Sequence, residues 1–156
     1  MRPASRLGVW SLLLGVLIAT CWRVASARNF GFQALGRLDE GEFHSMAFRT
    51  LDGDDQPFAS FKGKVVLVTN VASECGYTAT NYDQLKTLKS KFRDDLEVVL
   101  IPSNDFGGQE PGSEKEIREF INKAMGKEEV TVLEKSHVNG PETHPLIARL
   151  KVRLIH

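Results

Sequence analysis

Cys75 is the residue of this chain whose type and position best fit a chemical role. It follows a short β-branched-rich run at residues 65–68, and a segment with helical spacing begins a few residues after it. Backbone N–H groups and the positive end of the helix dipole then point at the sulfur, which stabilises the nucleophilic thiolate over the thiol. A lone cysteine is more often a small buried hydrophobe. Its place between a strand and a helix favours the reactive interpretation.

Gln109 is a second candidate, in the loop at residues 103–112, which holds three glycines and one proline. The loop begins where another apolar run, residues 96–102, ends. Ligand sites in open α/β sheets gather at the carboxyl ends of the strands, so we expect this loop to face Cys75. Its amide would then donate hydrogen bonds to a thiolate or to a reacting oxygen. A glutamine in such a loop is otherwise usually solvated, so its role depends on this predicted closeness.

The elements that must position these two residues form a predicted βαβ unit, which makes the fold class α/β. Residues 65–68 form a strand buried on both faces, and residues 96–102 form a second buried strand. The helical connection makes the two strands parallel. The helix between them has three candidate capping residues, Thr78, Thr80 and Asn81. Its apolar stripe comprises Tyr82, Leu85, Leu88 and Phe92.

A hairpin is predicted before this unit. Weak alternation at residues 44–51 indicates a strand, residues 52–55 a turn, and residues 57–61 the returning strand. Its polar turn, rich in aspartate and containing a glycine, is typical of a tight connection between strands.

More elements are predicted after the unit. Ser113 and Glu116 form a capping box that starts a helix, and Gly126 ends it. A short strand at residues 130–133 and a last helix at residues 143–150 follow, with a turn at residues 138–141 between them. The buried stripe of the capped helix is expected to comprise Ile117, Phe120, Ile121 and Ala124.

The N-terminal 27 residues have the features of a secretory signal peptide. Arg2 and Arg6 are basic, residues 7–22 are apolar except for one serine and one threonine, and residues 25–27 form a small-x-small cleavage site. We expect cleavage after this site and a location in the secretory pathway, in the ER lumen, outside the cell or in an organelle reached through it. An uncleaved signal anchor in a membrane is the alternative, although the apolar stretch falls just short of the roughly 17–25 residues that span a bilayer.

The rest of the chain comprises an expected mobile leader, residues 28–42, and one domain, residues 43–156. Removal of the signal takes away three arginines and no acidic residue, so the remaining chain has a net negative charge. This charge argues against nucleic acid or anionic lipid as a partner. Cys21 leaves with the signal, so Cys75 becomes a free thiol without an internal disulfide partner. The four histidines are scattered and give no metal-ligand spacing.

Three separated blocks resemble the glutathione peroxidases, a family with the thioredoxin-like fold. They are KGKVVLVTNVASECGYT at residues 62–78, IPSNDFGGQEPGS at residues 101–113 and VNGPETHPL at residues 138–146. The resemblance implies that Cys75 takes the place of the peroxidatic selenocysteine or cysteine, and that Gln109 is the glutamine of the catalytic tetrad. Asn70 matches an asparagine that we interpret as a structural brace.

The implied function is that of a thiol-dependent peroxidase in the response to oxidative stress. The Cys75 thiolate would reduce hydrogen peroxide or organic and lipid hydroperoxides, becoming a sulfenic acid that thiols reduce in turn. No prosthetic cofactor is expected, because the co-substrate is a thiol, either glutathione or a thioredoxin-like reductant. Absence of a resolving cysteine at residues 114–126 excludes an intramolecular disulfide cycle.

The sequence departs from the family in several places. The tetrad's tryptophan and asparagine lie in a WNF motif that the chain does not contain, and Trp10 and Trp22 both lie in the signal region. Ser103 and Asp105 stand where many members have Cys and Gln. We therefore expect a C-terminally truncated domain without its closing hairpin and helix, with self-association through an open sheet edge. A redox-sensing or relay module and an inactive truncated fragment are the alternative functions.

Overall fold

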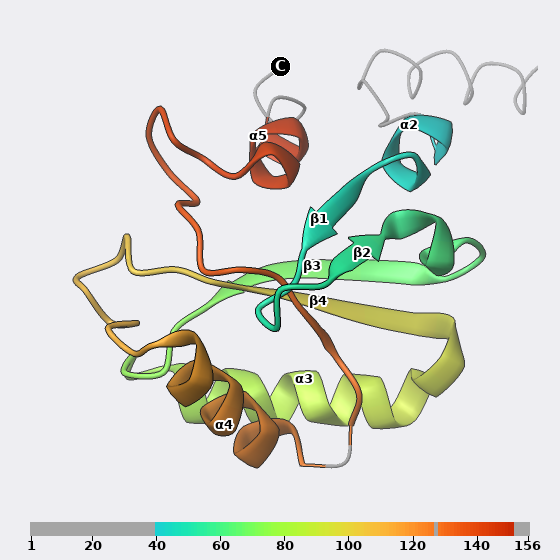
Figure 1. The fold of residues 1–156 in the computed structure, drawn as a ribbon. Coiled ribbons are helices and arrows are strands. Elements are labelled where there is room, and N and C mark those ends of the chain that lie inside the picture. Colours follow the sequence, from blue (N-terminus) through green and yellow to red (C-terminus); the bar gives the residue numbers. More distant parts are fainter. Residues whose placement is uncertain (1–39, 127, 152–156) are drawn as a thin grey trace, which may run out of the picture. The chain divides into compact units, whose positions relative to one another are not determined.

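The computed structural model describes residues 40–126 and 128–151, and Figure 1 shows their arrangement. These residues lie within one structural unit, Leu38–Val152. The elements in chain order are α2 (Glu40–His44), β1 (Ala47–Arg49), β2 (Asp55–Pro57), the 3₁₀ helix η1 (Phe58–Phe61), β3 (Val65–Val71), α3 (Thr78–Phe92), the 3₁₀ helix η2 (Arg93–Asp95), β4 (Leu96–Pro102), α4 (Glu114–Met125), β5 (Thr131–Val132) and α5 (Pro145–Lys151). The predicted signal peptide and most of the predicted leader fall outside the described residues, and residues 40–42 belong to α2.

The predicted βαβ unit is confirmed: β3 and β4 are parallel, with Val65 paired to Leu96 and Val71 to Pro102. β5 joins the other side of β4, also in parallel. Every residue of β4 is buried, as expected for the middle strand of a sheet. The prediction that residues 65–68 are buried on both faces is wrong, because β3 is the edge strand among the described residues and Val65 is 68% exposed.

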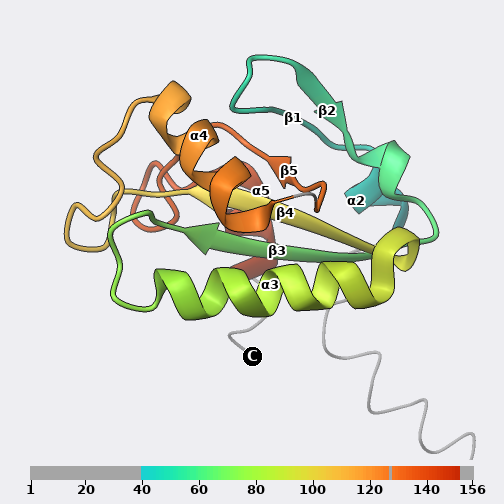
Figure 2. The same cartoon turned by 90° about the horizontal axis from the view of Figure 1, so that it is seen from below.

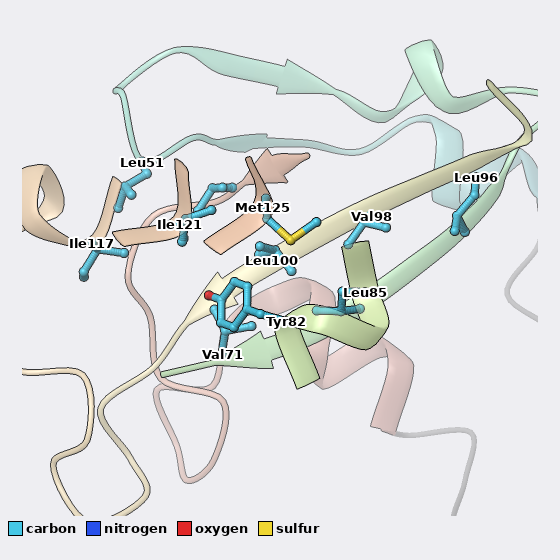
Figure 3. Close-up of a cluster of buried hydrophobic side chains, with 11 residues drawn as sticks. Leu51, Val71, Tyr82, Leu85, Leu96, Val98, Leu100, Ile117, Ile121 and Met125 are labelled. Carbon is cyan, nitrogen blue, oxygen red and sulfur yellow. The ribbon is translucent and has the colours of Figure 1, made fainter. Parts of the chain in front are cut away.

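Helices cover both faces of this sheet. In Figure 1, α3 and α4 lie below the sheet, and α5 and the β1–β2 hairpin lie above it. Figure 2 shows the same layers from below, with α3 and α4 in front of the sheet. The cluster between the sheet and these two helices is drawn in Figure 3, and Leu100 and Val98 of β4 lie at its centre with no exposed surface. A second cluster, around Phe58 and Leu146, fills the other face.

Helix α4 matches its prediction at both ends. The Ser113 hydroxyl accepts from the Glu116 N–H, and the Glu116 carboxylate accepts from the Ser113 N–H at 2.8 Å, which is the capping box. Gly126 ends the helix with φ +68°, a conformation that glycine adopts without strain.

Helix α3 differs from its prediction. No side chain caps it, since the Thr78 hydroxyl instead donates to the Ala72 carbonyl at 2.6 Å. Its predicted stripe is half correct, because Leu88 and Phe92 are 39% and 44% exposed. Lys89 is buried in their place and donates to the carbonyls of Leu96 at 2.7 Å and Arg93 at 3.2 Å, which satisfies its ammonium group.

The N-terminal hairpin is shorter than predicted. His44 ends α2 and does not start a strand, and the returning strand is β2, which ends where the predicted one begins. Residues 58–61 form η1 because Phe58 and Phe61 both turn into the core, which alternation along a strand would not allow. None of the helices within the described residues has the length and apolar character to cross a membrane.

Candidate active site

Cys75 lies in the loop that leaves the carboxyl end of β3 and enters α3. The Cys75 carbonyl accepts from the Thr78 N–H at 3.0 Å, which closes the turn that begins the helix. The thiol is free and half-buried. The local geometry is therefore the predicted one, a cysteine between the end of a strand and the start of a helix.

A pocket of about 490 Å³ opens beside this cysteine. Cys75, Gln109 and Asn70 all line it, so the loop at residues 103–112 faces the cysteine as expected. The remaining wall is largely apolar and comes from β3, α3 and the same loop, with Leu67, Thr69, Val71, Ala72, Thr78, Asn81, Tyr82, Gln84, Leu85, Leu88 and Phe106. Polar side chains capable of hydrogen bonding thus meet an apolar surface around one thiol.

The side chains of the three candidate residues have no hydrogen-bonding partner within the part of the chain that the structure describes. The amides of Gln109 and Asn70 are therefore available to a ligand in the pocket. Among the described residues no hydrogen bond to the Asn70 side chain is present, so its role as a structural brace stays a prediction. Nor do the described residues bring together three side chains able to hold a metal ion.

Glu110 connects the two loops of the site, a role that the sequence alone does not indicate. Its carboxylate accepts from the Ser73 hydroxyl at 2.7 Å, and its N–H donates to the Asn104 side chain at 2.9 Å. The neighbouring residues are also bonded: the N–H of Glu74, which follows Ser73, donates to the carbonyl of Gln109, which precedes Glu110, at 3.0 Å. Glu110 is only 1% exposed, so these bonds form away from solvent. They hold the backbone of the glutamine loop against the cysteine loop.

The glutamine loop bends sharply before these contacts. Gly107 and Gly108 have φ of +67° and +68°, and two successive residues in the left-handed region require glycine. Beyond the loop, the Lys135 ammonium donates to the carbonyls of Glu110 and Gly112. These two bonds anchor the carboxyl end of the loop.

Asp105 makes a second connection from the same loop, to the segment before α5. Its carboxylate contacts His137 Nδ1 at 2.6 Å and accepts from the N–H groups of Val138 and Asn139 at 2.7 and 3.0 Å. The hydrogen bond with His137 is the main cause that lowers the pKa of Asp105, and the same bond raises the pKa of His137. The ion pair therefore depends on pH.

Tyr82 lines the pocket from α3 and packs edge-on against Phe120, with ring centroids 5.6 Å apart. Its hydroxyl is buried and has no hydrogen-bonding partner among the described residues. Burial raises the pKa of Tyr82, and the nearby Glu110 raises it further. The phenol is therefore neutral across the physiological pH range.

Known proteins resemble this chain in sequence and in structure. The glutathione peroxidase family model matches residues 43–151. The "Phospholipid hydroperoxide glutathione peroxidase 1, chloroplastic" of Arabidopsis thaliana is 40% identical over 80% of this chain and 52% of its own length. The "Glutathione peroxidase 2" of Caenorhabditis elegans is 42% identical over 69% of this chain and 66% of its own length.

A fission-yeast relative and one crystal structure extend this likeness. The "Glutathione peroxidase-like peroxiredoxin gpx1" of Schizosaccharomyces pombe is 45% identical over 70% of this chain and 68% of its own length. The crystal structure of "Trgpx in apo form" superposes with a TM-score of 0.52 at 32% identity, covering 70% of this chain and 63% of that one. The chain spans about half the length of the first curated relatives it matches. This chain belongs to the glutathione peroxidase family and has an α/β, thioredoxin-like fold.

Proposed function

We propose that this protein is a thiol-dependent peroxidase with Cys75 as the peroxidatic residue and Gln109 as a catalytic hydrogen-bond donor. The observation that carries the proposal is the pocket that both residues line, at the carboxyl ends of β3 and β4. Membership of the glutathione peroxidase family supports it. Asn70 offers a second free amide at the same pocket.

The proposed reaction begins with attack of the Cys75 thiolate on one oxygen of a peroxide. The S–O bond forms as the O–O bond breaks, and the leaving alkoxide or hydroxide takes a proton from water to become an alcohol or water. The Gln109 amide stabilises the negative charge on the leaving oxygen. One external thiol then displaces water from the sulfenic acid to form a mixed disulfide, and a second releases Cys75 as the thiol.

The pocket wall favours organic over inorganic peroxide as the substrate. Leu67, Leu88 and Phe106 offer an apolar surface next to the thiol, and a relative is named for phospholipid hydroperoxide. The proposed reductant is an external thiol, glutathione or a thioredoxin-like protein, because removal of the predicted signal peptide takes Cys21 away and leaves Cys75 without a second cysteine in this sequence. We also propose that the N-terminal sequence directs the protein into the secretory pathway, or to an organelle reached through it.

The test is peroxide consumption by residues 28–156, purified beside a Cys75→Ser variant. We expect thiol-dependent turnover of an alkyl hydroperoxide by the original chain and none by the variant. A single-turnover reaction followed by a sulfenic-acid probe and mass spectrometry should label Cys75 alone. A folded chain that neither consumes peroxide nor takes the label would overturn the proposal and favour an inactive protein.

A further inference from the structure

The carboxylate of Asp105 joins the loop that carries Gln109 to the segment at residues 137–139. Its Oδ1 lies 2.6 Å from His137 Nδ1, and its Oδ2 accepts from the next two backbone N–H groups at 2.7 and 3.0 Å. Both oxygens of the carboxylate are therefore engaged. The proposed reaction assigns no role to Asp105, and the sequence departs from the family pattern at this position, where many members have glutamine.

The segment that Asp105 binds is itself fixed to the core. The Ser136 N–H donates to the carbonyl of Pro102, the last residue of β4, at 3.0 Å. The His137 carbonyl accepts from the His144 N–H at 2.7 Å. Val138 is 3% exposed and belongs to the second core cluster. Asp105 therefore attaches the glutamine loop to a rigid support.

This attachment bears directly on the position of Gln109, which follows Asp105 by four residues. Gly107 and Gly108 lie between them, both at positive φ. Glycine restricts the backbone less than any other residue, so the chain between Asp105 and Gln109 transmits little stiffness of its own. The orientation of the loop then depends on its anchors, which are Asp105 before the glycines and Glu110 directly after Gln109.

His137 makes the strength of the first anchor depend on pH. Two carboxylates face its ring: Asp105 at Nδ1, and Glu142 at 3.6 Å from Nε2. Lys151 of α5 adds a cation to the same segment, donating to the Val138 carbonyl and to the Asn139 side chain. A protonated His137 gives Asp105 a charge-assisted hydrogen bond, which is roughly twice as strong as a neutral one. The anchor therefore weakens as pH rises through the pKa of His137, which the pair raises.

We propose that Asp105 is a positioning residue for Gln109, and that the protonation of His137 sets the strength of this positioning. The role rests on the proposed function, because Gln109 acts there in the reaction of Cys75 with peroxide. While His137 is protonated, the loop stays attached to residues 137–139 and the Gln109 amide stays at the pocket. At higher pH the loop detaches more often, and the reaction loses its donor for that fraction of the molecules.

Single-turnover kinetics across a pH series test this positioning. The proteins are the wild type, His137→Gln, Asp105→Asn and the double variant, each reacted with an alkyl hydroperoxide. His137→Gln keeps a neutral donor, and ionisation of Cys75 affects all proteins alike, so it cancels in ratios of rates. We expect the ratio of wild type to His137→Gln to be greatest near pH 5–6 and to approach about 1 near pH 9.

The other variants show whether His137 acts through Asp105. Asp105→Asn should be slower than the wild type at every pH, and adding His137→Gln to it should have no pH-dependent effect. Asp94→Asn, an exposed carboxylate in η2 before the amino end of β4, should react like the wild type. A wild-type to His137→Gln ratio that stays constant with pH, or the same pH dependence without Asp105, would overturn the proposal.

Hydrogen exchange measures the anchor without peroxide. The amides of Val138, which donates to Asp105, and Glu110, which donates to Asn104, report its opening. Between about pH 5.5 and 9, their protection factors should fall about tenfold further in the wild type than in Asp105→Asn, the scale of a charge-assisted against a neutral bond.

The exchange data also separate this proposal from the proposed function. If none of the proteins consumes peroxide, the proposed function fails, and pH-dependent protection of the two amides would still support the anchor. Equal protection in the wild type and Asp105→Asn would overturn it. So would an equal loss of protection among the amides of β4, because Asp105 would then stabilise the whole domain rather than position one loop.

Discussion

The Ser73 hydroxyl donates a 2.7 Å hydrogen bond to the buried carboxylate of Glu110, which lies 37 residues further along the chain. Ser73 is two residues before Cys75, and Glu110 follows Gln109 directly. The bond therefore fixes the distance between the two loops that carry the proposed catalytic residues. Glu110 touches neither the thiol nor the pocket, so we assign it a positioning role.

Replacement of Glu110 by alanine should separate these loops. It leaves the half-buried Ser73 hydroxyl without its acceptor and removes the buried Glu110 side chain, which costs about 1–3 kcal/mol of unfolding free energy. Sulfenic-acid formation at Cys75 should also slow, because Gln109 loses its anchor. Glu110→Gln keeps an acceptor oxygen and should restore most of the rate. Unfolding in urea and single-turnover kinetics measure the two effects, with Glu119→Ala on the exposed face of α4 as the control. Equal rates in all three variants would contradict the positioning role.

Replacement of Gln109 by alanine should slow the reaction of Cys75 with peroxide without changing stability. A preorganised donor at a charged centre contributes about 10²–10³ in rate when it is well aligned, and we expect a loss of at least about tenfold. Gln84 lines the same pocket from α3 and provides a matched control, since Gln84→Ala should leave the rate unchanged. Stopped-flow kinetics of peroxide reduction would give both rates. A similar effect of both substitutions would mean that pocket shape, rather than the Gln109 amide, matters.

The Asp105–His137 pair should make stability depend on pH. The raised pKa of His137 means that its contribution is complete below the unfolded value of about 6.5 and is lost as pH rises through the folded value. The lowered pKa of Asp105 means that its contribution is complete above about pH 4 and is lost as pH falls through the folded value. The pair is therefore fully charged between about pH 4 and pH 6.5.

We expect the thermal midpoint of the wild type to exceed that of His137→Gln most near pH 5–6, and the difference to shrink toward about pH 9. Glu142, whose carboxylate lies 3.6 Å from His137 Nε2, adds to this trend. Burial lowers the pKa of His144, which weakens both proteins at acid pH and cancels in the difference. Thermal unfolding of both proteins across this pH series measures the difference between their midpoints. A difference that stays constant with pH would show that His137 acts through packing alone.

The parts of the fold that the sequence predicts well have strong local signals. The bounds of β4 match the predicted residues because a run that is apolar except for Glu97 ends at Pro102, and α4 is bounded by the Ser113 capping box and by Gly126. The proximity of Gln109 to Cys75 was also predictable, because both residues follow the carboxyl ends of neighbouring parallel strands.

Other features depend on contacts between distant residues. Glu110 resembles any surface glutamate in the sequence, and its burial follows from the hydroxyl of Ser73 in another loop. Exposure of β3 depends on which strands lie beside it, which an apolar run does not encode. In α3, helical spacing places Leu88 and Lys89 equally near the core. The carbonyls at the end of the helix select Lys89, because they accept from its ammonium group.

The two leucines of α3 should therefore differ in their contribution to stability. Leu85 is 9% exposed and belongs to the cluster drawn in Figure 3, so Leu85→Ala should cost about 2–5 kcal/mol of unfolding free energy. Leu88 is 39% exposed, so Leu88→Ala should cost at most about 1 kcal/mol. Both substitutions exchange the same residues within one helix, so differences in helix propensity cancel. Urea unfolding of the two variants gives the comparison, and equal losses would mean that α3 packs with the face that its apolar spacing predicts.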